Sequence, residues 1–246
     1  MTNNKNQLPN DLETIEVDDI TINVKRSTRR KTLSLEISTH GAIVRVPQKM
    51  KIRVIEEFIK SKRHWLKQHY ENRPKPIEPI ELKNGAVVKF LNENYALSIL
   101  DKPRSQITIK NNNIIVPLGQ TKTEFHKALK NKLIRWYKKQ AQDCLRDKVL
   151  FFAEEMQIPL KKSTQIKVRD YKRRWGSCSH KGDLTFNWRI IMAPEEVLDY
   201  VAIHEIAHLK EFNHSKKFWN IVYQQCPEWQ QQRDWLNEQG GSLYRF

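Results

Sequence analysis

The sequence predicts an α+β protein in which a strand-rich N-terminal part precedes a domain organised around one metal-binding helix. Three observations support this prediction: short apolar segments with period-two alternation, a later pattern with helical period, and His-Glu-Ile-Ala-His at residues 204–208. We expect a flexible lead-in over residues 1–19, a strand-rich region over 20–122 with a candidate internal repeat, and a metal-binding domain over 123–246.

Composition excludes several classes of protein. The 246 residues include seven Trp, seven Tyr and nine Phe, so the chain can bury a substantial core. No 18-residue apolar run occurs, and the N-terminus lacks an apolar signal core, so we expect neither a membrane span nor secretion. Cys144, Cys178 and Cys226 are widely spaced and odd in number, which predicts free thiols in a cytoplasmic protein.

Alternating apolar residues predict two similar groups of strands in the N-terminal part. Strands of the first group are expected at residues 20–24, 33–37 and 42–47, and strands of the second at 87–90, 95–100, 107–109 and 114–117. Each group precedes an amphipathic helix, of about twenty residues in the first case and spanning roughly 123–156 in the second. Because Val46-Pro47 and Val116-Pro117 end the groups alike, we infer a duplication whose first copy is a positioning or recognition platform.

The C-terminal domain is expected to place short strands before the metal-binding helix. A strand is predicted at 165–169, a turn-rich loop at 173–179 and a β-rich segment at 183–191. Pro194 suits the start of the helix, because its missing N–H and fixed φ cost nothing there. Ser215 is a favourable N-cap for the next helix.

The spacing of three histidines predicts a catalytic metal centre. His204 and His208 are four residues apart, so both imidazoles lie on one helix face and can reach one ion. His214 follows six residues later, far enough for the chain to turn back with a third nitrogen. Three protein ligands leave one tetrahedral position of Zn²⁺ open, and Glu205 is placed to contact a water there. The alternative is two hydrogen-bonded core histidines with His214 at the surface.

Net charge is the second signal for function. The formal net charge is +16 and the pI is about 9.7. Residues 161–174 contain seven Lys or Arg and one acid, Asp170. Counterion release at such a surface favours a polyanionic partner, most plausibly nucleic acid. A solvated basic surface that binds nothing specific is the alternative, and the sequence does not separate the two.

The sequence resembles the YgjP-like metallopeptidase family, which looks related to the SprT/Spartan-type proteases that degrade proteins bound to DNA. The residues that carry the resemblance are Arg174-Trp175-Gly176-Ser177-Cys178-Ser179, Asn187, residues 204–208, His214-Ser215 and Phe218-Trp219. The resemblance implies a zincin-like metallopeptidase domain with an HExxH active-site helix. It also implies zinc on His204, His208 and His214, with Glu205 as the general base.

The chain departs from the metzincin pattern HExxHxxGxxH, although its third histidine has the metzincin spacing. Glu211 stands where that pattern has glycine, and all four methionines precede His204, so no Met-turn can follow. We therefore expect a different turn before His214. Asn213 tolerates a left-handed conformation and is expected to end the helix.

Other residues near the motif have open roles. Arg174, Trp175 and Asn187 are candidates for substrate binding: Arg174 through a developing oxyanion, Trp175 by lining the cleft, and Asn187 by orienting a ligand histidine or capping a turn. Cys178 is expected to pack within its loop rather than bind zinc. Residues 184–187 are expected to form an edge strand that pairs with an extended peptide.

Two other functions remain open from the residues alone. The same metal centre could cleave a phosphoanhydride in a nucleotide, although the sequence has no P-loop. The chain could also be a non-catalytic nucleic-acid-binding protein with structural zinc. The preferred hypothesis is a zinc-dependent peptidase with a protein or peptide substrate, and nucleic-acid-associated proteins are the candidate substrates.

Overall fold

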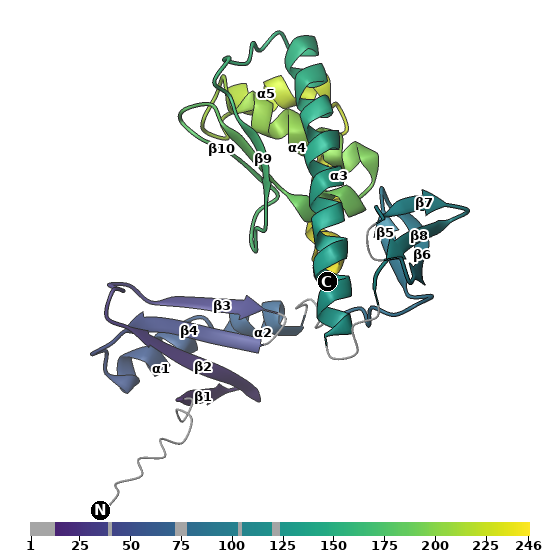
Figure 1. Cartoon of the computed structure of the whole chain (residues 1–246). Coiled ribbons are helices and arrows are strands. Elements are labelled where there is room, and N and C mark those ends of the chain that lie inside the picture. Colours follow the sequence, from purple (N-terminus) through teal and green to yellow (C-terminus); the bar gives the residue numbers. More distant parts are fainter. Residues whose placement is uncertain (1–12, 39–40, 72–77, 103–104, 120–123) are drawn as a thin grey trace, which may run out of the picture. The chain divides into compact units, whose positions relative to one another are not determined.

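The computed structural model describes residues 13–38, 41–71, 78–102, 105–119 and 124–246. The chain divides into two compact units, an N-terminal unit of residues 1–77 and a C-terminal unit of residues 78–246 (Figure 1). No helix in the described ranges is both long and apolar enough to cross a lipid bilayer.

The N-terminal unit is a four-stranded sheet with two helices. Its elements are β1 (Thr14–Val17), β2 (Ile20–Ser27), β3 (Ser34–Ser38), β4 (Gly41–Pro47), α1 (Ile52–Ser61) and α2 (Arg63–Glu71). The strand order is β1-β2-β4-β3, with β2 and β4 parallel and the outer pairs antiparallel. Alternate residues of β2 and β4 point into one core, where Ile55, Ile59 and Leu66 of the helices cover them.

Two features of this unit differ from the sequence-based expectation. β1 lies inside the predicted lead-in, and it is joined to β2 by a two-residue turn in which Asp18 and Asp19 have φ of 50° and 61°. Residues 1–12 of that lead-in lie outside the described residues. The expected helix of about twenty residues is broken, because the Lys62 N–H donates to the Ile59 carbonyl three residues back and tightens the last turn of α1.

The C-terminal unit begins with a second four-stranded sheet of the same design. It consists of β5 (Val87–Phe90), β6 (Glu93–Leu100), β7 (Thr108–Lys110) and β8 (Asn113–Pro117). The order is β5-β6-β8-β7, with β6 and β8 parallel and the outer pairs antiparallel, as in the first sheet. A proline also occupies the same position in both sheets. Pro47 pairs with Ser27 and Pro117 pairs with Leu100, each at the end of the parallel ladder.

A small sheet and a group of helices complete the unit. They are α3 (Phe125–Glu155), β9 (Ile166–Arg169), β10 (Gly176–Cys178), β11 (Leu184–Asn187), η1 (Trp188–Met192), α4 (Glu195–Ala207), α5 (Lys216–Gln225), α6 (Trp229–Glu238) and η2 (Gly240–Tyr244). The order β10-β11-β9 places β11 in the centre, antiparallel to β10 and parallel to β9. The expectation of an edge strand at 184–187 is therefore wrong, and β10 is an edge instead.

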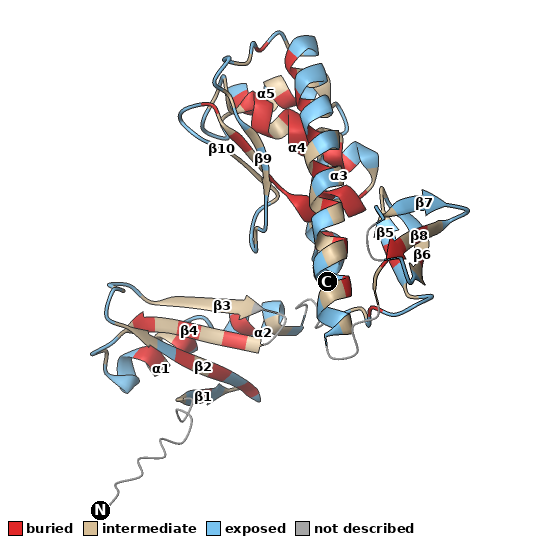
Figure 2. Ribbon diagram, in the orientation of Figure 1, coloured by how far each residue is buried: buried red, intermediate tan, exposed pale blue. Residues whose placement is uncertain are grey.

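The long helix α3 joins the second sheet to the rest of the unit. Its buried residues recur every four positions, at Leu129, Leu133, Tyr137, Ala141, Leu145, Val149 and Ala153. Four residues turn an α-helix by about 400°, so this buried stripe shifts by roughly 40° at each step and winds around the helix. Different partners are therefore buried along its length (Figure 2).

Contacts along α3 show this change of partner. Near its start, the Tyr137 hydroxyl donates to the Lys89 carbonyl of β5 at 2.8 Å. Farther along, the Gln142 side chain bonds the backbone of β9, and Lys148 pairs with Asp199 of α4 at 2.6 Å. One hydrophobic core runs from Leu82 to Leu243. The predicted domain boundary at residues 122/123 thus falls inside the C-terminal unit.

Candidate metal centre and catalytic cleft

Three histidines from two segments meet at the end of α4. His204 lies in the last turn of α4, His208 is its C-cap residue, and His214 lies in the connection to α5. One ring nitrogen from each lies within 4.8 Å of the others, and the Nε2 atoms of His204 and His214 are 3.1 Å apart. The alternative of a separate surface His214 does not describe this geometry, although its ring is exposed.

Short backbone hydrogen bonds turn the chain back after His208. The Lys210 and Glu211 N–H groups both donate to the Ala207 carbonyl at 3.0 Å, which closes the helix. None of residues 209–214 is among those with positive φ in the described chain, so Glu211 needs no glycine in its place. The expected left-handed Asn213 is wrong; its side chain instead accepts a bond from the Ser215 N–H at 3.0 Å.

Burial keeps the imidazoles of His204 and His208 neutral. Burial lowers the pKa of His204 to about 3, with His208 and His214 adding to the effect, and burial also lowers the pKa of His208. The ring of Phe218 stacks on His208 with centroids 4.4 Å apart. Ser215 caps α5 by accepting from the Phe218 N–H, as expected, and so places that ring. A neutral imidazole retains the lone pair that a metal needs.

One hydrogen bond selects the tautomer of His208. Its Nδ1 lies 3.0 Å from the Glu211 carbonyl, which can only accept, so Nδ1 carries the proton. The Nε2 lone pair then faces the other histidines. Such a bond from the far ring nitrogen is the usual support of a metal-binding histidine. Glu211 thus contributes through its backbone.

The donor set fits zinc. Two nitrogens bound to tetrahedral zinc at about 2.0–2.1 Å lie roughly 3.3 Å apart, close to the 3.1 Å between His204 and His214. All three donors are imidazoles, which suit zinc better than Mg²⁺ or Ca²⁺. Cys178 is outside the group; burial raises the pKa of its thiol to about 11, and Sγ donates to the Ser179 carbonyl.

Glu205 is a buried carboxyl beside the histidines. Only 5% of its surface is exposed, and Oε2 has no hydrogen-bond partner among the described residues. Burial raises the pKa of Glu205 to about 8, and the positive charge of Arg174 partly opposes this. A buried carboxyl without a partner costs stability, so its retention indicates a chemical role.

Gly176 of β10 leaves room for the Glu205 side chain. A Cβ at position 176 would lie 2.6 Å from Glu205 Cγ and 2.7 Å from Cδ, closer than atoms in contact can approach. A second close approach follows nearby, because a Cβ on Gly240 would lie 2.8 Å from Trp175 Cζ2. The Trp-Gly pair of the loop is thus packed against both α4 and η2.

A cleft of about 260 Å³ opens beside the histidines. It is lined by Arg174, Trp175, Gly176, Tyr200, Val201, His204, Glu205, Arg233, Leu236 and Asn237. Two of the three substrate-binding candidates, Arg174 and Trp175, therefore line it. Tyr200 and Arg233 were missed by the sequence analysis. Tyr200 precedes His204 by one helical turn and was detectable from spacing, whereas no local pattern marks Arg233 in α6.

The third candidate, Asn187, is fully buried and does not line the cleft. Its Nδ2 donates to the Tyr171 carbonyl at 3.0 Å and the Tyr244 hydroxyl at 2.7 Å, and its Oδ1 accepts from the Arg189 N–H at 3.2 Å. Asn187 therefore caps η1 and anchors the loop before β10. No described hydrogen bond joins it to a histidine.

One family of known proteins matches most of the chain. The model of the YgjP-like metallopeptidase domain matches residues 31–239. No curated protein matches the chain. Among solved structures, the metallopeptidase zymogen abylysin of Pyrococcus abyssi is 24% identical, with a TM-score of 0.33 over 39% of this chain and 95% of its own. The zymogen jannalysin of Methanocaldococcus jannaschii is 26% identical, with a TM-score of 0.32 over 37% and 93%.

The family model spans both units and includes the histidine cluster, the Glu205 carboxyl and the Trp-Gly loop. A family of metallopeptidases also requires a bound metal, for which the described residues offer the three convergent imidazoles. The chain therefore belongs to the YgjP-like metallopeptidase family and is a metal-dependent hydrolase.

Proposed function

We propose that the protein is a zinc-dependent peptidase in which His204, His208 and His214 hold the ion and Glu205 carries the proton. The observation that carries this proposal is the convergence of three imidazole nitrogens beside a buried carboxyl. When bound, zinc supplies Lewis acidity toward a substrate carbonyl oxygen and toward water. No residue of the site resembles a P-loop, and no observation favours a phosphoanhydride substrate.

Glu205 is suited to accept a proton and return it. Its carboxyl lies in the cleft wall next to His204, and its raised pKa lets it hold a proton near neutral pH. A cation at the histidines would favour the carboxylate and bring this pKa down toward the operating pH. The same oxygen can then take a proton from the attacking water and pass it to the leaving amine.

The free edge of β10 is suited to hold an extended substrate. The Trp175 carbonyl accepts a hydrogen bond from the Asn187 N–H, and the Ser179 N–H donates to the Asp183 carbonyl. The backbone groups of Trp175 and Ser179 therefore face β11. In an antiparallel ladder these bonds alternate, so the backbone groups of Gly176 and Cys178 point to the other side. An extended peptide can add to these groups as a further strand. We therefore assign the pairing with an extended peptide, which the sequence analysis gave to residues 184–187, to β10 at residues 176–178.

Cationic groups in the cleft suit the charge that develops at a peptide carbonyl. Arg174, from the loop before β10, and Arg233, from α6, both line the cleft. Burial raises the pKa of Tyr200 to about 12, so its hydroxyl remains a hydrogen-bond donor at any working pH. We assign to these groups the stabilisation of the developing oxyanion. Trp175 forms the apolar wall against which a substrate side chain packs.

Nucleic-acid association remains part of the proposal, supported by charge alone. All seven Lys and Arg residues between 161 and 174 are exposed, and the single acid, Asp170, is bound to Arg189 at 2.5 Å. An exposed strip of this kind favours contact with phosphates. The three cysteines are free thiols, which favours the cytoplasmic location that the sequence predicts.

Peptidase activity is tested with zinc-loaded protein on casein and histone, alongside Glu205→Gln. The variant keeps the shape of the side chain but removes its proton transfer, so we expect a loss of about 10²–10⁴-fold in kcat with zinc content unchanged. His204→Ala, His208→Ala and His214→Ala should each lose zinc. Full zinc content in one of them excludes that residue, and hydrolysis by Glu205→Gln at the wild-type rate excludes Glu205.

Nucleic-acid binding is measured separately by titrating DNA and RNA at several salt concentrations. The affinity should fall as salt rises, and replacing Lys167 and Arg169 by Gln should reduce the slope by about two, one per lost contact. An absence of binding at low salt removes nucleic acid from the proposal and leaves the peptidase assignment intact.

A further inference from the structure

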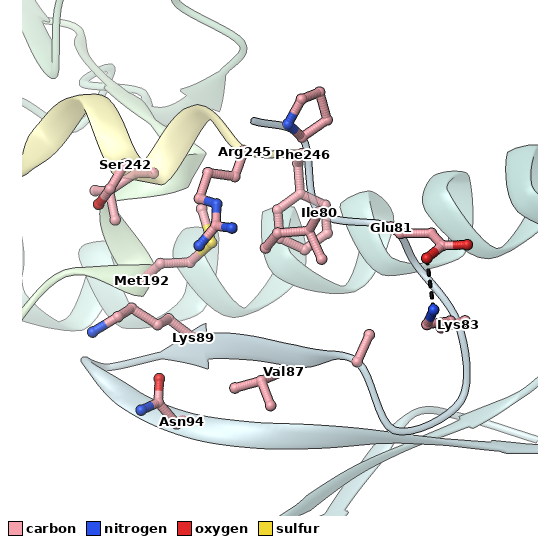
Figure 3. A pocket seen from close by; sticks show the side chains of 13 residues that line it. Ile80, Glu81, Lys83, Val87, Lys89, Asn94, Met192, Ser242, Arg245 and Phe246 are labelled. Atoms are coloured by element: carbon pink, nitrogen blue, oxygen red, sulfur yellow. Dashed lines mark hydrogen bonds and ion pairs between the residues drawn. The ribbon is translucent and has the colours of Figure 1, made fainter. Parts of the chain in front are cut away.

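One cavity of the C-terminal unit lies away from the three histidines. Its volume is about 410 Å³, within the range of small-molecule and peptide sites, and it contains none of the three histidines. Four segments form its walls: the chain around residues 79–83, the β5–β6 hairpin, the end of η1 at Met192, and the end of η2 with the residues that follow (Figure 3).

One part of this cavity is apolar. Val87 of β5 is 57% exposed, although its neighbour Val88 is buried in the core, because alternate residues of the strand face opposite sides. The other apolar residues that line it are Pro79, Ile80, Ala86, Met192, Leu243 and Phe246. An exposed valine inside a concave surface gains free energy when a ligand covers it.

The charges are distributed unevenly over the cavity. At one end, Glu81 and Lys83 form an ion pair of 2.7 Å and neutralise each other. Figure 3 shows Lys89 and Arg245 at the other end, with Ile80, Phe246 and Val87 between the two ends. In the part of the chain that the structure describes, no carboxylate forms an ion pair with Lys89 or Arg245.

Both cations are held in place by hydrogen bonds that leave donors unused. Lys89 Nζ donates to the Asn92 side-chain oxygen at 3.1 Å, and Arg245 Nε donates to the Glu78 carbonyl at 3.2 Å. The bond to Nε fixes the guanidinium plane, while no described bond engages the two terminal nitrogens. A guanidinium presents such donors as a fork that matches a carboxylate.

We propose that this cavity is a binding site for a carboxylate attached to an apolar group. The carboxylate lies between Lys89 and Arg245, and the apolar group covers Val87 and contacts Phe246. A free apolar carboxylic acid and the C-terminal residue of a peptide share this chemistry. The site has only two uncompensated cations and no helix N-terminus among its lining residues, which favours a monoanion over a phosphate.

Calorimetric titration of the zinc-loaded full chain carrying Glu205→Gln tests the site without substrate cleavage. The probes are acetyl-Leu-Phe and 4-phenylbutyrate, each compared with its uncharged partner, acetyl-Leu-Phe amide or 4-phenylbutanol. Each acid should bind at least tenfold more tightly than its partner, because only the acid engages the two cations. Tighter binding of the peptide acid identifies a peptide terminus as the preferred source, and tighter binding of 4-phenylbutyrate identifies a free acid.

Variants locate the binding. Arg245→Gln and Lys89→Gln should each weaken both acids by about tenfold to a hundredfold, and Val87→Asp should abolish binding by repulsion. The double variant Glu81→Gln/Lys83→Gln is the matched control, because it removes the ion pair without changing the net charge of the cavity, and it should bind as the parent does. Zinc content and melting temperature identify a misfolded variant. Lys89→Gln changes only an exposed side chain, so it tests the charge recognition by itself if Arg245→Gln unfolds.

Three results overturn the proposal. Equal affinity for the acids and their uncharged partners removes the charge recognition. Loss of binding on chelation of zinc places the acids at the histidines instead. Tighter binding of phenyl phosphate than of 4-phenylbutyrate assigns the site to a phosphate. Because the assay uses Glu205→Gln, its outcome does not depend on whether the metal centre hydrolyses peptides.

Discussion

The two four-stranded sheets have the same strand order and the same directions but different partners. The sheet β1–β4 is covered by its own short helices, and its core consists of residues from the N-terminal unit alone. The sheet β5–β8 has no separate helices of its own that form a core with it alone. Its buried residues, including Val88 and Leu97, belong to the same core as Val197 and Ile203 of α4, the helix that carries His204.

This difference shows how one design can serve as an independent unit or as part of a catalytic one. The N-terminal sheet needs only α1 and α2 to exclude water. The second sheet instead contacts α3, where Tyr137 bonds to Lys89 and Trp136 packs on Phe90 of β5. The buried stripe of α3 continues to η1 and α4. We therefore expect equivalent damage to the two sheets to have different consequences for zinc.

The largest effect is expected from Leu133→Ala in α3. It removes a fully buried side chain between the second sheet and the rest of the core and should lower the free energy of unfolding by about 2–5 kcal/mol. Zinc affinity should fall with it. Ile55→Ala is the matched change in the N-terminal unit and should leave zinc affinity unchanged. Chemical denaturation and zinc titration measure both, and equal zinc loss in the two variants would contradict two separate cores.

Gly176→Ala tests the contact between β10 and α4. The new methyl group must displace Glu205, so kcat should fall about tenfold to a hundredfold with zinc content unchanged, and stability should fall by about 1–3 kcal/mol. The double variant with Glu205→Ala removes the obstructing side chain. In that background the stability cost of Gly176→Ala should largely disappear, as a double-mutant cycle measures. A cost that persists there would show that another contact is responsible.

The pH dependence of the metal-free protein should differ between the units. The pKa of Glu205 is raised to about 8, so its contribution to stability is present below its ordinary 4.5 and is lost as pH rises to 8. The pKa of His204 is lowered from 6.5 to about 3, so its contribution is lost as pH falls through that interval. These trends oppose each other between pH 4.5 and 6.5, and Glu205 alone then lowers stability from pH 6.5 to 8.

The N-terminal unit should show no decline from pH 6.5 to 8. Its Glu13 has a pKa lowered by hydrogen bonding to Arg26, so this stabilisation is present above 4.5 and is lost only on acidification. Thermal melts of metal-free protein with separate reporters for each unit make this comparison. Zinc should remove most of the alkaline decline by favouring the Glu205 carboxylate; an equal decline with zinc bound would argue against an ion beside that residue.

The smallest effect is expected from deleting residues 1–77. Because the C-terminal unit has its own core, its melting temperature and zinc affinity should remain close to those of the full chain. Activity on short peptides should be retained as well. Circular dichroism and zinc titration measure this, and an unfolded product would show that the second unit depends on the first.

Local patterns predicted the parts of the fold that local physics determines. Alternation located the strands of both four-stranded sheets except β1, and the parallel between Val46-Pro47 and Val116-Pro117 indicated their common design. The spacing of His204, His208 and His214 predicted that their rings could meet. In each case the interacting residues share one element or lie a few residues apart, so their geometry follows from the period of the chain.

The remaining features depend on residues far apart in the sequence. β1 has only two inward residues, Ile15 and Val17, and follows a polar segment, so its pairing with β2 was missed. The central place of β11 depends on its parallel pairing with β9 across 18 residues. Asn187 finds its partner Tyr244 57 residues away, and Arg233 enters the cleft from α6. The local period of a sequence does not predict contacts between residues so far apart.

The four-residue spacing along α3 constrains how this chain can change length. One residue inserted between Tyr137 and Ala141 would rotate Leu145 by about 100° and shift it by about 1.5 Å relative to Leu133. Either the second sheet or α4 would then meet polar side chains. Seven inserted residues would nearly restore the angle but separate the two contacts by about 10.5 Å. Viable insertions should therefore be confined to the loops, and a scan of inserted alanines through this helix should find almost none tolerated.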